Sequence, residues 1–409
     1  MTTFTGIYYI YNAICATHVI LQYVHSSYNI DAIFKQLYWR KSRLSIRCVC
    51  VCAFEGITRR REIEMELLGV KFAPLNTPLE RRLQTLAAAA WIMMLVFGGF
   101  TSCVITALLL IYTSVVRYFF LVYLAWVFFI DRETCERGGR SDSWILWMRN
   151  HAWWHYFCAY FPIKLVKTAD LDPSKNYLLC TFPHGVLCTG AFGAFATDVL
   201  GFHKLYPGLR VRMLTLGQHF NMPLFREFVY SFGACSASAR SIEHLVSVPG
   251  GGRATVLAVG GASESLKCKP GTYRVILKRR KGFVRIALKH GAPLVPVFSF
   301  GETDLYSQVD NPEGSLLRYL QEMLRKFTGI APVLPIGRGL FQYSFGIVPR
   351  RRPVTVVVGA ALNVPKISEP TREQIDEYQK KFIEKLVELF ETHKHHYLPN
   401  PENTHLIID

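Results

Sequence analysis

Charge is scarce in this sequence. Only 19% of its 409 residues are charged, against about 25% in an average soluble domain, whereas 50% are hydrophobic and 13% are aromatic. Intrinsic disorder needs the opposite balance, and neither a low-complexity segment nor an internal repeat occurs, so disordered and collagen-like chains are excluded. The apolar residues exceed what one core needs, which indicates a membrane partner.

Cysteine is not dense enough for a disulfide scaffold, and acidic residues are fewer than basic ones. Eleven Cys, an odd number, are too few for a disulfide scaffold, which predicts reduced thiols in a cytosol-facing protein. Lys and Arg outnumber Asp and Glu by 47 to 30, a net charge of +17. This excess predicts an anionic partner: nucleic acid, a membrane surface or a phosphate-bearing substrate. No aromatic–basic nucleic-acid module is visible, so we expect no nucleic-acid partner.

Residues 1–64 carry few interpretable signals, and we treat them as an N-terminal extension. Phe4–Tyr23 is apolar but has no basic residue before it, so it makes a poor signal peptide. Cys48, Cys50 and Cys52 lack a fourth ligand at a familiar spacing, and on a strand they would simply share one face. We therefore expect no metal site in this segment.

A long stretch with almost no charge occupies residues 83–130. Leu83–Val116 contains 34 uncharged residues, and after Arg117 another 13 follow to Ile130. Because a single span needs about 20 apolar residues, the stretch predicts a helical hairpin that crosses or re-enters a membrane. Arg117 would then snorkel or face protein. A buried helix pair of a soluble protein is the alternative.

The sequence also predicts the turn and the orientation of this hairpin. Gly98-Gly99 or Thr101-Ser102 is the expected turn. Arg81 and Arg82 precede the hairpin, so the positive-inside rule places the lead-in, residues 65–82, in the cytosol. An even number of spans returns residues 131–409 to the same side.

Residues 131–409 alternate short apolar runs with amphipathic helical stretches. Most of the runs are apolar throughout, as in strands that are covered on both faces. The alternation predicts an α/β sheet domain, which ends in a helix that begins with a capping box, Thr371-x-x-Gln374. The predicted strands are Tyr177–Phe182, Val211–Leu216, Ala254–Val259, Leu294–Phe300 and Val354–Val358, and further helices are predicted at Pro223–Ser231, Lys281–His290 and Leu316–Phe327.

His184 is the leading candidate for chemistry. It follows the apolar run Tyr177–Phe182, and catalytic groups in such sheets usually lie beyond the carboxyl ends of strands. Pro183 cannot extend a strand ladder and Gly185 permits a tight turn, so a small loop presents the imidazole. Histidine titrates near neutral pH and can take a proton from an attacking hydroxyl. A turn histidine bonded to backbone is the structural alternative.

A second candidate segment runs from Val259 to Ser265 and also ends a strand-like run. Glu264 is placed to orient an imidazole or to accept a hydrogen bond from a hydroxyl. An equally good alternative is a structural role, as an acidic residue at a helix N-terminus that the helix dipole attracts. Ser263 is a weak nucleophile candidate because Ser265 stands where a nucleophile elbow needs its last glycine.

A basic group provides a third candidate. Arg280 and Lys281 belong to a run of four cationic residues that opens a helix, and Arg338 adds to the basic side. Helix-start amides together with Arg and Lys suit a phosphate group. A solvated or membrane-facing basic surface is the alternative reading.

Several motifs in order resemble the diacylglycerol acyltransferase 2 family. The resemblance runs from about Met65 to Leu398, and within the family it is strongest to the monoacylglycerol acyltransferase branch. The motifs that carry it are Tyr160-Phe161-Pro162, Phe182-Pro183-His184-Gly185, Arg280-Lys281-Gly282-Phe283, Leu294-Val295-Pro296, Phe300-Gly301-Glu302 and Gly337-Arg338-Gly339-Leu340-Phe341; those typical of the branch are Phe72-Ala73-Pro74-Leu75, Glu80-Arg81-Arg82-Leu83-Gln84-Thr85 and Phe341-Gln342-Tyr343-Ser344-Phe345-Gly346.

One motif departs from the family pattern. The family's first motif histidine is Phe182 here. The H-x4-D dyad of related glycerolipid acyltransferases would place its Asp at 189, where this chain has Thr189, so the dyad is absent. The resemblance thus leaves His184 as the catalytic base and Glu264 as its best partner. Backbone amides near Gly185 or Gly261 are the candidates for stabilising an oxyanion.

The resemblance implies an enzyme that transfers a fatty acyl group from coenzyme A to monoacylglycerol or diacylglycerol. It implies the endoplasmic reticulum membrane, with lipid droplets as a second location, and acyl-CoA as a co-substrate with no cofactor and no metal. Arg280, Lys281 and Arg338 are then expected to hold the coenzyme phosphates, and a homo-oligomer is compatible. A long-chain alcohol acceptor giving wax ester, and a non-catalytic lipid-binding homologue, are the alternatives.

Overall fold

The computed structural model describes residues 65–67, 69–74 and 76–409, all within one compact unit. The predictions for residues 1–64, including those for Phe4–Tyr23 and for Cys48, Cys50 and Cys52, lie outside the described residues.

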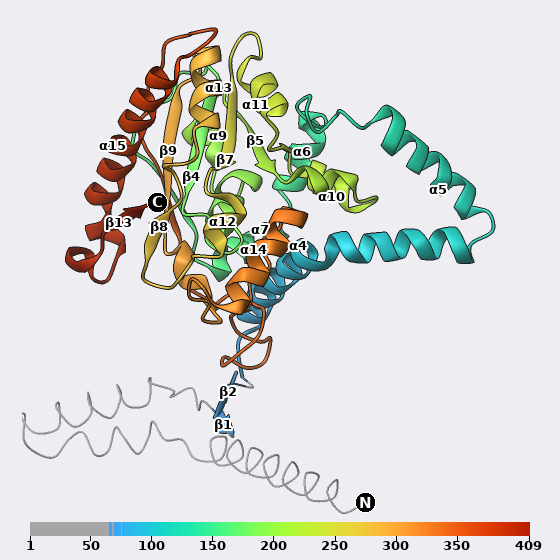
Figure 1. The fold of residues 1–409 in the computed structure, drawn as a ribbon. Coiled ribbons are helices and arrows are strands. Elements are labelled where there is room, and N and C mark those ends of the chain that lie inside the picture. Colours follow the sequence, from blue (N-terminus) through green and yellow to red (C-terminus); the bar gives the residue numbers. More distant parts are fainter. Residues whose placement is uncertain (1–64, 68, 75) are drawn as a thin grey trace, which may run out of the picture. The chain divides into compact units, whose positions relative to one another are not determined.

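A seven-stranded sheet forms the centre of the fold, in the order β3-β12-β9-β4-β7-β5-β6 (Figure 1). Neighbouring strands run parallel, apart from the antiparallel pair β12 and β9. Each of the five predicted strands begins and ends within one residue of its prediction, so the α/β expectation is confirmed. The strands are β3 Lys164–Lys167, β4 Tyr177–Phe182, β5 Arg210–Thr215, β6 Ala234–Ser236, β7 Arg253–Ala258, β9 Leu294–Phe300 and β12 Thr355–Val358.

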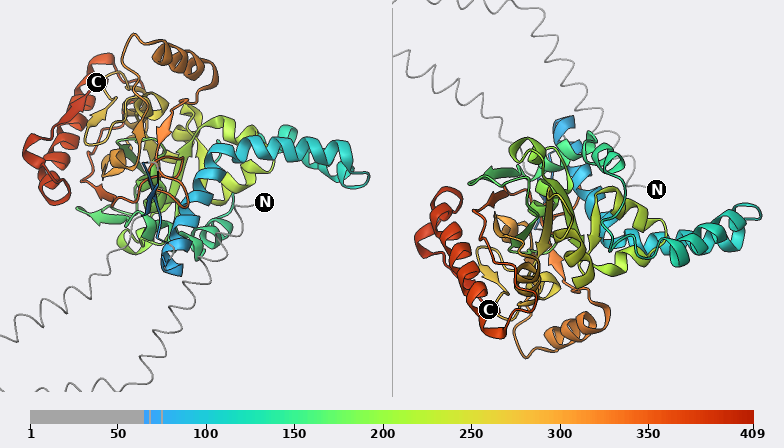
Figure 2. Two further views of the ribbon diagram at one scale, coloured as in Figure 1. Left: turned by 90° about the horizontal axis from the view of Figure 1, so that it is seen from below. Right: turned by 90° about the horizontal axis from the view of Figure 1, so that it is seen from above.

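Helices cover both faces of the sheet, which explains why its strands are apolar throughout (Figure 2). Successive side chains of a strand point to opposite faces. Leu179 of β4 therefore packs into the core formed with α7 (Trp153–Tyr160) and the start of α4 (Leu79–Tyr112). Leu178 packs into the other core, with α11 (Ala239–Val246), α13 (Gly282–His290) and α15 (Arg372–Tyr397).

The remaining elements lie around the sheet and the helices that cover it. The predicted capping box of the last helix is present, because Thr371 and Gln374 each accept a hydrogen bond from the other's backbone amide. The other helices are α5 Val116–Ala125, α6 Asp142–Arg149, α8 Thr189–Ala191, α9 Phe202–Leu205, α10 Phe225–Ser231, α12 Gly261–Ser265 and α14 Leu316–Thr328, with η1 Trp126–Ile130, η2 Phe192–Ala196, η3 Gly217–Asn221, η4 Glu302–Leu305 and η5 Pro401–Asn403; small sheets pair β1 Met65–Leu67 with β2 Val70–Phe72, β8 Tyr273–Val275 with β13 Leu406–Ile408, and β10 Ser307–Gln308 with β11 Pro335–Ile336.

The helical hairpin is present, but the expected turn was misplaced. Helix α4 continues through Gly98-Gly99 and Thr101-Ser102, and the chain turns between α4 and α5, after Tyr112. The two glycines serve a close helix crossing, since a Cβ on Gly98 would lie 2.8 Å from the ring of Phe225 in α10. The Ser102 hydroxyl is satisfied within the helix by the Gly99 carbonyl.

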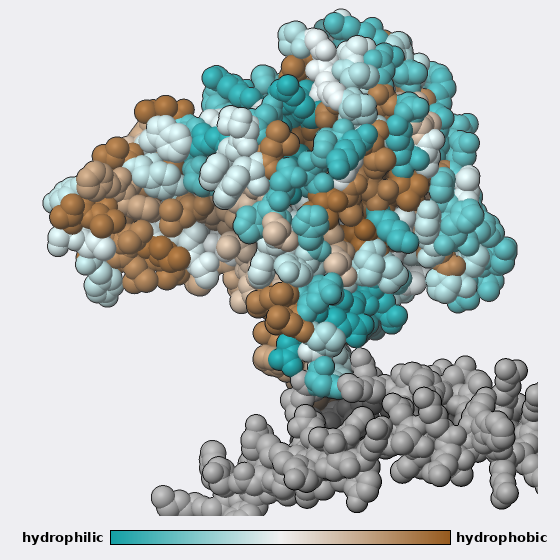
Figure 3. Space-filling model, turned by 180° about the vertical axis from the view of Figure 1, so that it is seen from behind, coloured by the Kyte–Doolittle hydropathy of each residue, from teal (hydrophilic) through white to brown (hydrophobic). Residues whose placement is uncertain are grey.

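Helix α4 combines the two predicted alternatives. Its first half is core, because Ala87, Ala88 and Trp91 are buried against α7. Its second half, together with α5, projects from the sheet domain and exposes apolar side chains (Figures 1 and 3). Of the described helices, α4 alone is long and apolar enough to cross a membrane, with a mean hydropathy of 2.3 in its most apolar window.

Candidate active site

The loop after the central strand β4 presents His184 at the carboxyl edge of the sheet. Pro183 follows Phe182 and ends the ladder, and Gly185 turns the chain with a φ of 61°. No side chain fits at Gly185, because a Cβ there would lie 2.6 Å from Cγ of Glu302. The predicted position of His184 at a strand end is therefore confirmed.

Two contacts orient the ring of His184. Its Nδ1 lies 2.9 Å from Oγ of Ser265 and 3.3 Å from the carbonyl oxygen of Gly185. A carbonyl can only accept a hydrogen bond, so the proton of the neutral ring is assigned to Nδ1. Nε2 then carries the lone pair, and it has no hydrogen-bond partner among the described residues. Burial lowers the pKa of this partly buried histidine, which favours the neutral ring.

Glu264 is adjacent to His184 but does not orient its ring. One carboxylate oxygen accepts the backbone N–H of His184, and the other accepts the Ile276 N–H at 2.8 Å. The side chain is almost fully buried, and burial raises its pKa to about 7 despite these two amides. The structure therefore places Glu264 behind the loop backbone, and the hydroxyl of Ser265 contacts the ring instead.

Glu302 holds the other end of the same loop. This residue follows β9, and its two carboxylate oxygens accept the N–H groups of Thr189 and Gly190 at 2.8 and 2.7 Å. It is buried, and burial raises its pKa to about 7 as well. Two buried carboxylates thus fix the segment from His184 to Gly190. The sequence alone assigned no role to Ser265 or Glu302. For Glu302, the Phe300-Gly301-Glu302 motif could have pointed to the site.

Phe182, which replaces a family histidine, is a core residue. Its side chain is fully buried in the core formed with α13 and α15, and its ring centroid lies 6.2 Å from that of Phe382. The residue at this position is therefore part of the packing beneath α15.

The three basic candidates have different surroundings. Arg280 donates to the Gly260 carbonyl at 3.2 Å and to Ser263 Oγ at 3.4 Å, so it lies beside the segment that carries Glu264. Lys281 is ion-paired with Asp376 of α15. Arg338 stacks on Tyr343, 4.3 Å from the ring centroid, and donates to carbonyls of its own loop. Of the three, only Arg280 makes a recorded contact with the segment around Glu264.

Two backbone amides near the histidine remain without an acceptor. Within the described part of the chain, neither Gly185 N–H nor Gly261 N–H has a recorded hydrogen bond. Gly261 has a φ of 59°, and a Cβ added to it would meet nothing within 4 Å. Both amides therefore stay candidates for stabilising an oxyanion.

A neutral imidazole with an open Nε2 can accept a proton from a bound hydroxyl. A largely parallel sheet that carries this group at the carboxyl edge of its central strand has the architecture of an α/β enzyme. The fold and the site thus define the protein as an α/β enzyme.

Comparison with known proteins identifies the family. The diacylglycerol acyltransferase family model matches residues 109–409. The 2-acylglycerol O-acyltransferase 1 of Bos taurus is 48% identical over 83% of this chain and all of its own length. The diacylglycerol O-acyltransferase 2 of Dictyostelium discoideum is 44% identical over 80% of this chain and 96% of its own. The chain belongs to the diacylglycerol acyltransferase family, and the expected resemblance is confirmed.

A solved structure also matches, with low similarity. The 1-acyl-sn-glycerophosphate (LPA) acyltransferase PlsC from Thermotoga maritima covers 75% of this chain and 96% of its own, with a TM-score of 0.34 and 13% identity.

Proposed function

We propose that this chain is an acyl-CoA-dependent O-acyltransferase that esterifies monoacylglycerol or diacylglycerol, with His184 as the general base. The family assignment supports the reaction, because the relatives are named for acyl transfer to 2-acylglycerol and diacylglycerol. The observation that carries the role of His184 is its neutral ring with an open Nε2 at the carboxyl edge of the sheet.

The proposed step needs no covalent enzyme intermediate. Nε2 of His184 takes the proton of the acceptor hydroxyl while its oxygen attacks the thioester carbonyl. The Gly185 and Gly261 amides stabilise the oxyanion of the tetrahedral intermediate. The C–S bond then breaks, and the imidazolium returns its proton to the leaving thiolate. The Gly185 carbonyl favours the productive tautomer, Ser265 holds the ring at Nδ1, and Glu264 holds the backbone that carries the ring.

Arg280 is the basic residue best placed to meet the coenzyme. It lies beside Glu264, and its charge acts on that carboxyl group. Lys281 and Arg338, which were predicted for the same role, have other partners, Asp376 and Tyr343. We therefore assign the coenzyme phosphates to Arg280 first, and contributions from the other two require those contacts to open.

The substrates explain the apolar surfaces of the molecule. The projecting part of α4 and α5 exposes apolar side chains such as Phe100 and Phe119, which suits insertion into a bilayer (Figure 3). Helix α14 adds a second apolar surface, because Phe327 is 82% exposed while Arg318 and Gln321 are buried. We propose the endoplasmic reticulum membrane as the location, with lipid droplets as a second site and the sheet domain in the cytosol.

An acyl-transfer assay tests the proposal. Purified full-length protein in phosphatidylcholine nanodiscs is given labelled acyl-CoA with monoacylglycerol, diacylglycerol or a long-chain alcohol. We expect ester formation with at least one acylglycerol, at a higher rate than with the alcohol. Faster formation of wax ester would identify a long-chain alcohol as the acceptor in place of an acylglycerol. Binding of acyl-CoA without transfer to any acceptor would identify a non-catalytic homologue.

A further inference from the structure

A cluster of arginines lies at the opposite edge of the sheet from His184. Arg210 of β5 and Arg253 of β7 are register partners, and Arg212 stands two residues after Arg210, so all three share one face of the sheet. They surround one carboxylate: Asp142 lies 2.6 Å from Arg210, 2.5 Å from Arg212 and 3.9 Å from Arg253.

The positive charge of this cluster is not balanced. Three guanidinium groups and one carboxylate give a net charge of +2. Nη1 of Arg253 is buried, and within the described residues it has no hydrogen-bond partner, since 3.9 Å to Asp142 is too long for a hydrogen bond. Buried charged groups are normally paired and hydrogen-bonded, so this atom lacks the acceptor that its environment demands. Burial and, to a smaller extent, the charge of Arg212 also lower the pKa of Arg253.

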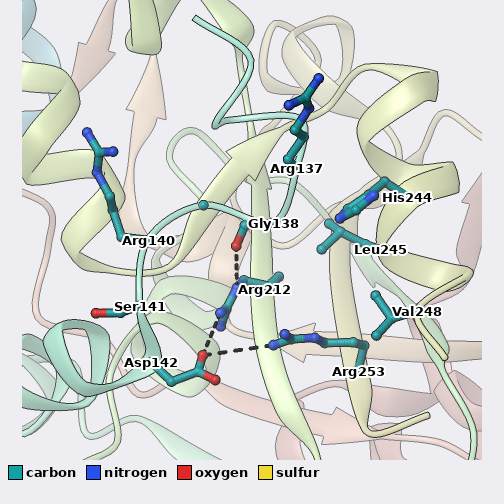
Figure 4. A pocket seen from close by; sticks show the side chains of 11 residues that line it. Arg137, Gly138, Arg140, Ser141, Asp142, Arg212, His244, Leu245, Val248 and Arg253 are labelled. Atoms are coloured by element: carbon teal, nitrogen blue, oxygen red, sulfur yellow. Dashed lines mark hydrogen bonds and ion pairs between the residues drawn. The ribbon is translucent and has the colours of Figure 1, made fainter. Parts of the chain in front are cut away.

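A pocket of about 270 Å³ opens at this cluster. Figure 4 shows Arg212 and Arg253 directed at Asp142 from two strands, with His244 of α11 on the adjoining wall. Arg137 and Arg140 extend away from Asp142 and are neutralised elsewhere, Arg137 by Glu133 and Arg140 by Asp131 and Glu227. Among the arginines of the pocket, Arg253 therefore carries the unsatisfied donor, Nη1.

We propose that this pocket is a second ligand site, which binds the phosphate group of an anionic ligand through Arg253 and Arg212. A guanidinium group binds two phosphate oxygens at once, and an anion here would supply the missing acceptor for Nη1 of Arg253. His244 and Ser141 line the same pocket.

The site is separate from the catalytic loop. Arg253 precedes Ala254, the register partner of Tyr177 at the start of β4, whereas His184 follows the end of that strand. Six strand residues span about 20 Å. The loop that lines the pocket, residues 137–142, follows the helical hairpin after a short connection, so the ligand binds where the hairpin joins the sheet domain. Its phosphate belongs either to an anionic phospholipid headgroup or to free coenzyme A.

Thermal unfolding of the purified full chain tests the site. Inorganic phosphate is compared with chloride at equal ionic strength, in neutral detergent. We expect phosphate to raise the midpoint by about 2 °C or more over chloride, since a ligand stabilises the state that binds it. Arg253→Gln should abolish the difference. Arg240→Gln removes the same charge from an exposed arginine outside the pocket lining and should keep it.

Two further arms identify the source of the phosphate. Phosphatidylcholine nanodiscs with and without phosphatidic acid test the headgroup, and coenzyme A against 3′-dephospho-coenzyme A tests the nucleotide. The site is supported if either ligand stabilises the wild type and the Arg240→Gln variant but not the Arg253→Gln variant. The proposal fails if no phosphate probe raises the unfolding midpoint of the wild type above its value in chloride, and this result does not depend on the folding of a variant. It also fails if Arg253→Gln leaves the stabilisation by phosphate unchanged.

Discussion

Nδ1 of His184 lies 2.9 Å from the hydroxyl oxygen of Ser265, a residue 81 positions later in the chain. This contact, with the Gly185 carbonyl on the same atom, sets the tautomer of the ring and leaves Nε2 open. The hydroxyl belongs to the last residue of α12, whose preceding residue, Glu264, accepts the His184 backbone amide. One short helix therefore fixes both the ring and the backbone of the proposed base.

Removing the Ser265 hydroxyl should slow the reaction without abolishing it. One hydrogen bond is worth about 1 kcal/mol, so Ser265→Ala should lower kcat about five-fold with little effect on KM for acyl-CoA. Ser265→Thr keeps the hydroxyl and should retain more activity than the alanine variant. Steady-state kinetics of both variants check this, and equal losses in the two would argue against the ring contact.

The rate should fall on the acid side of neutrality. Burial lowers the pKa of His184 from its usual value of 6.5, and a protonated imidazole cannot accept the proton of the hydroxyl. The acid limb of kcat/KM should therefore be centred below pH 6.5. A profile of kcat/KM against pH measures it, and a limb centred above pH 7 would show that a different group controls the rate.

Glu302 should stabilise the catalytic loop. Glu302→Gln leaves one of the two amides of Thr189 and Gly190 without an acceptor, which should cost about 1–3 kcal/mol of unfolding free energy. Denaturant unfolding measures the change. Glu388→Gln, at an exposed position of α15, is the matched control and should change stability by less than about 0.5 kcal/mol.

The same carboxyl group should give stability a specific pH dependence. The folded pKa of Glu302 is raised to about 7 from a usual value of 4.5, so the folded state binds more protons between these values. Its contribution to stability is present below pH 4.5 and is lost as pH rises through 7. The slope of unfolding free energy against pH over this range should be less negative in Glu302→Gln. An unchanged slope would contradict the assignment.

Restoring the family histidine at position 182 should not increase activity. Phe182 is fully buried against Phe382, so Phe182→His places a polar ring in an apolar core and should cost about 1–3 kcal/mol. Phe182→Leu, which stays apolar, is the control for packing. Transfer rates and unfolding midpoints of both variants check this. A histidine variant that alone forms ester would mean that His184 is insufficient.

The strands and the last helix could be predicted because their signals are local. Continuous apolar runs identified β4 and β9 to the residue, and the Thr371 capping box marked the start of α15. The turn of the hairpin could not be predicted this way. Gly98 and Gly99 resemble turn residues in the sequence, but their role is a close contact with Phe225 and Met222, which are distant in the chain.

The site was predicted in part for the same reason. His184 follows its strand directly, so position along the chain sufficed. Ser265 and Glu302 reach the loop from 81 and 113 residues away, and only the folded sheet brings them together. The ion pair of Lys281 with Asp376 likewise depends on α15 packing beside α13, which the basic run itself does not reveal.

The most direct test of the account is the transfer rate of His184→Ala. The variant and the wild type are expressed to equal levels in membranes and supplied with labelled acyl-CoA and an acylglycerol acceptor. We predict a loss of about 100-fold to 10,000-fold with normal accumulation of the protein, as expected for removal of a general base. Turnover equal to that of the wild type would contradict the central claim.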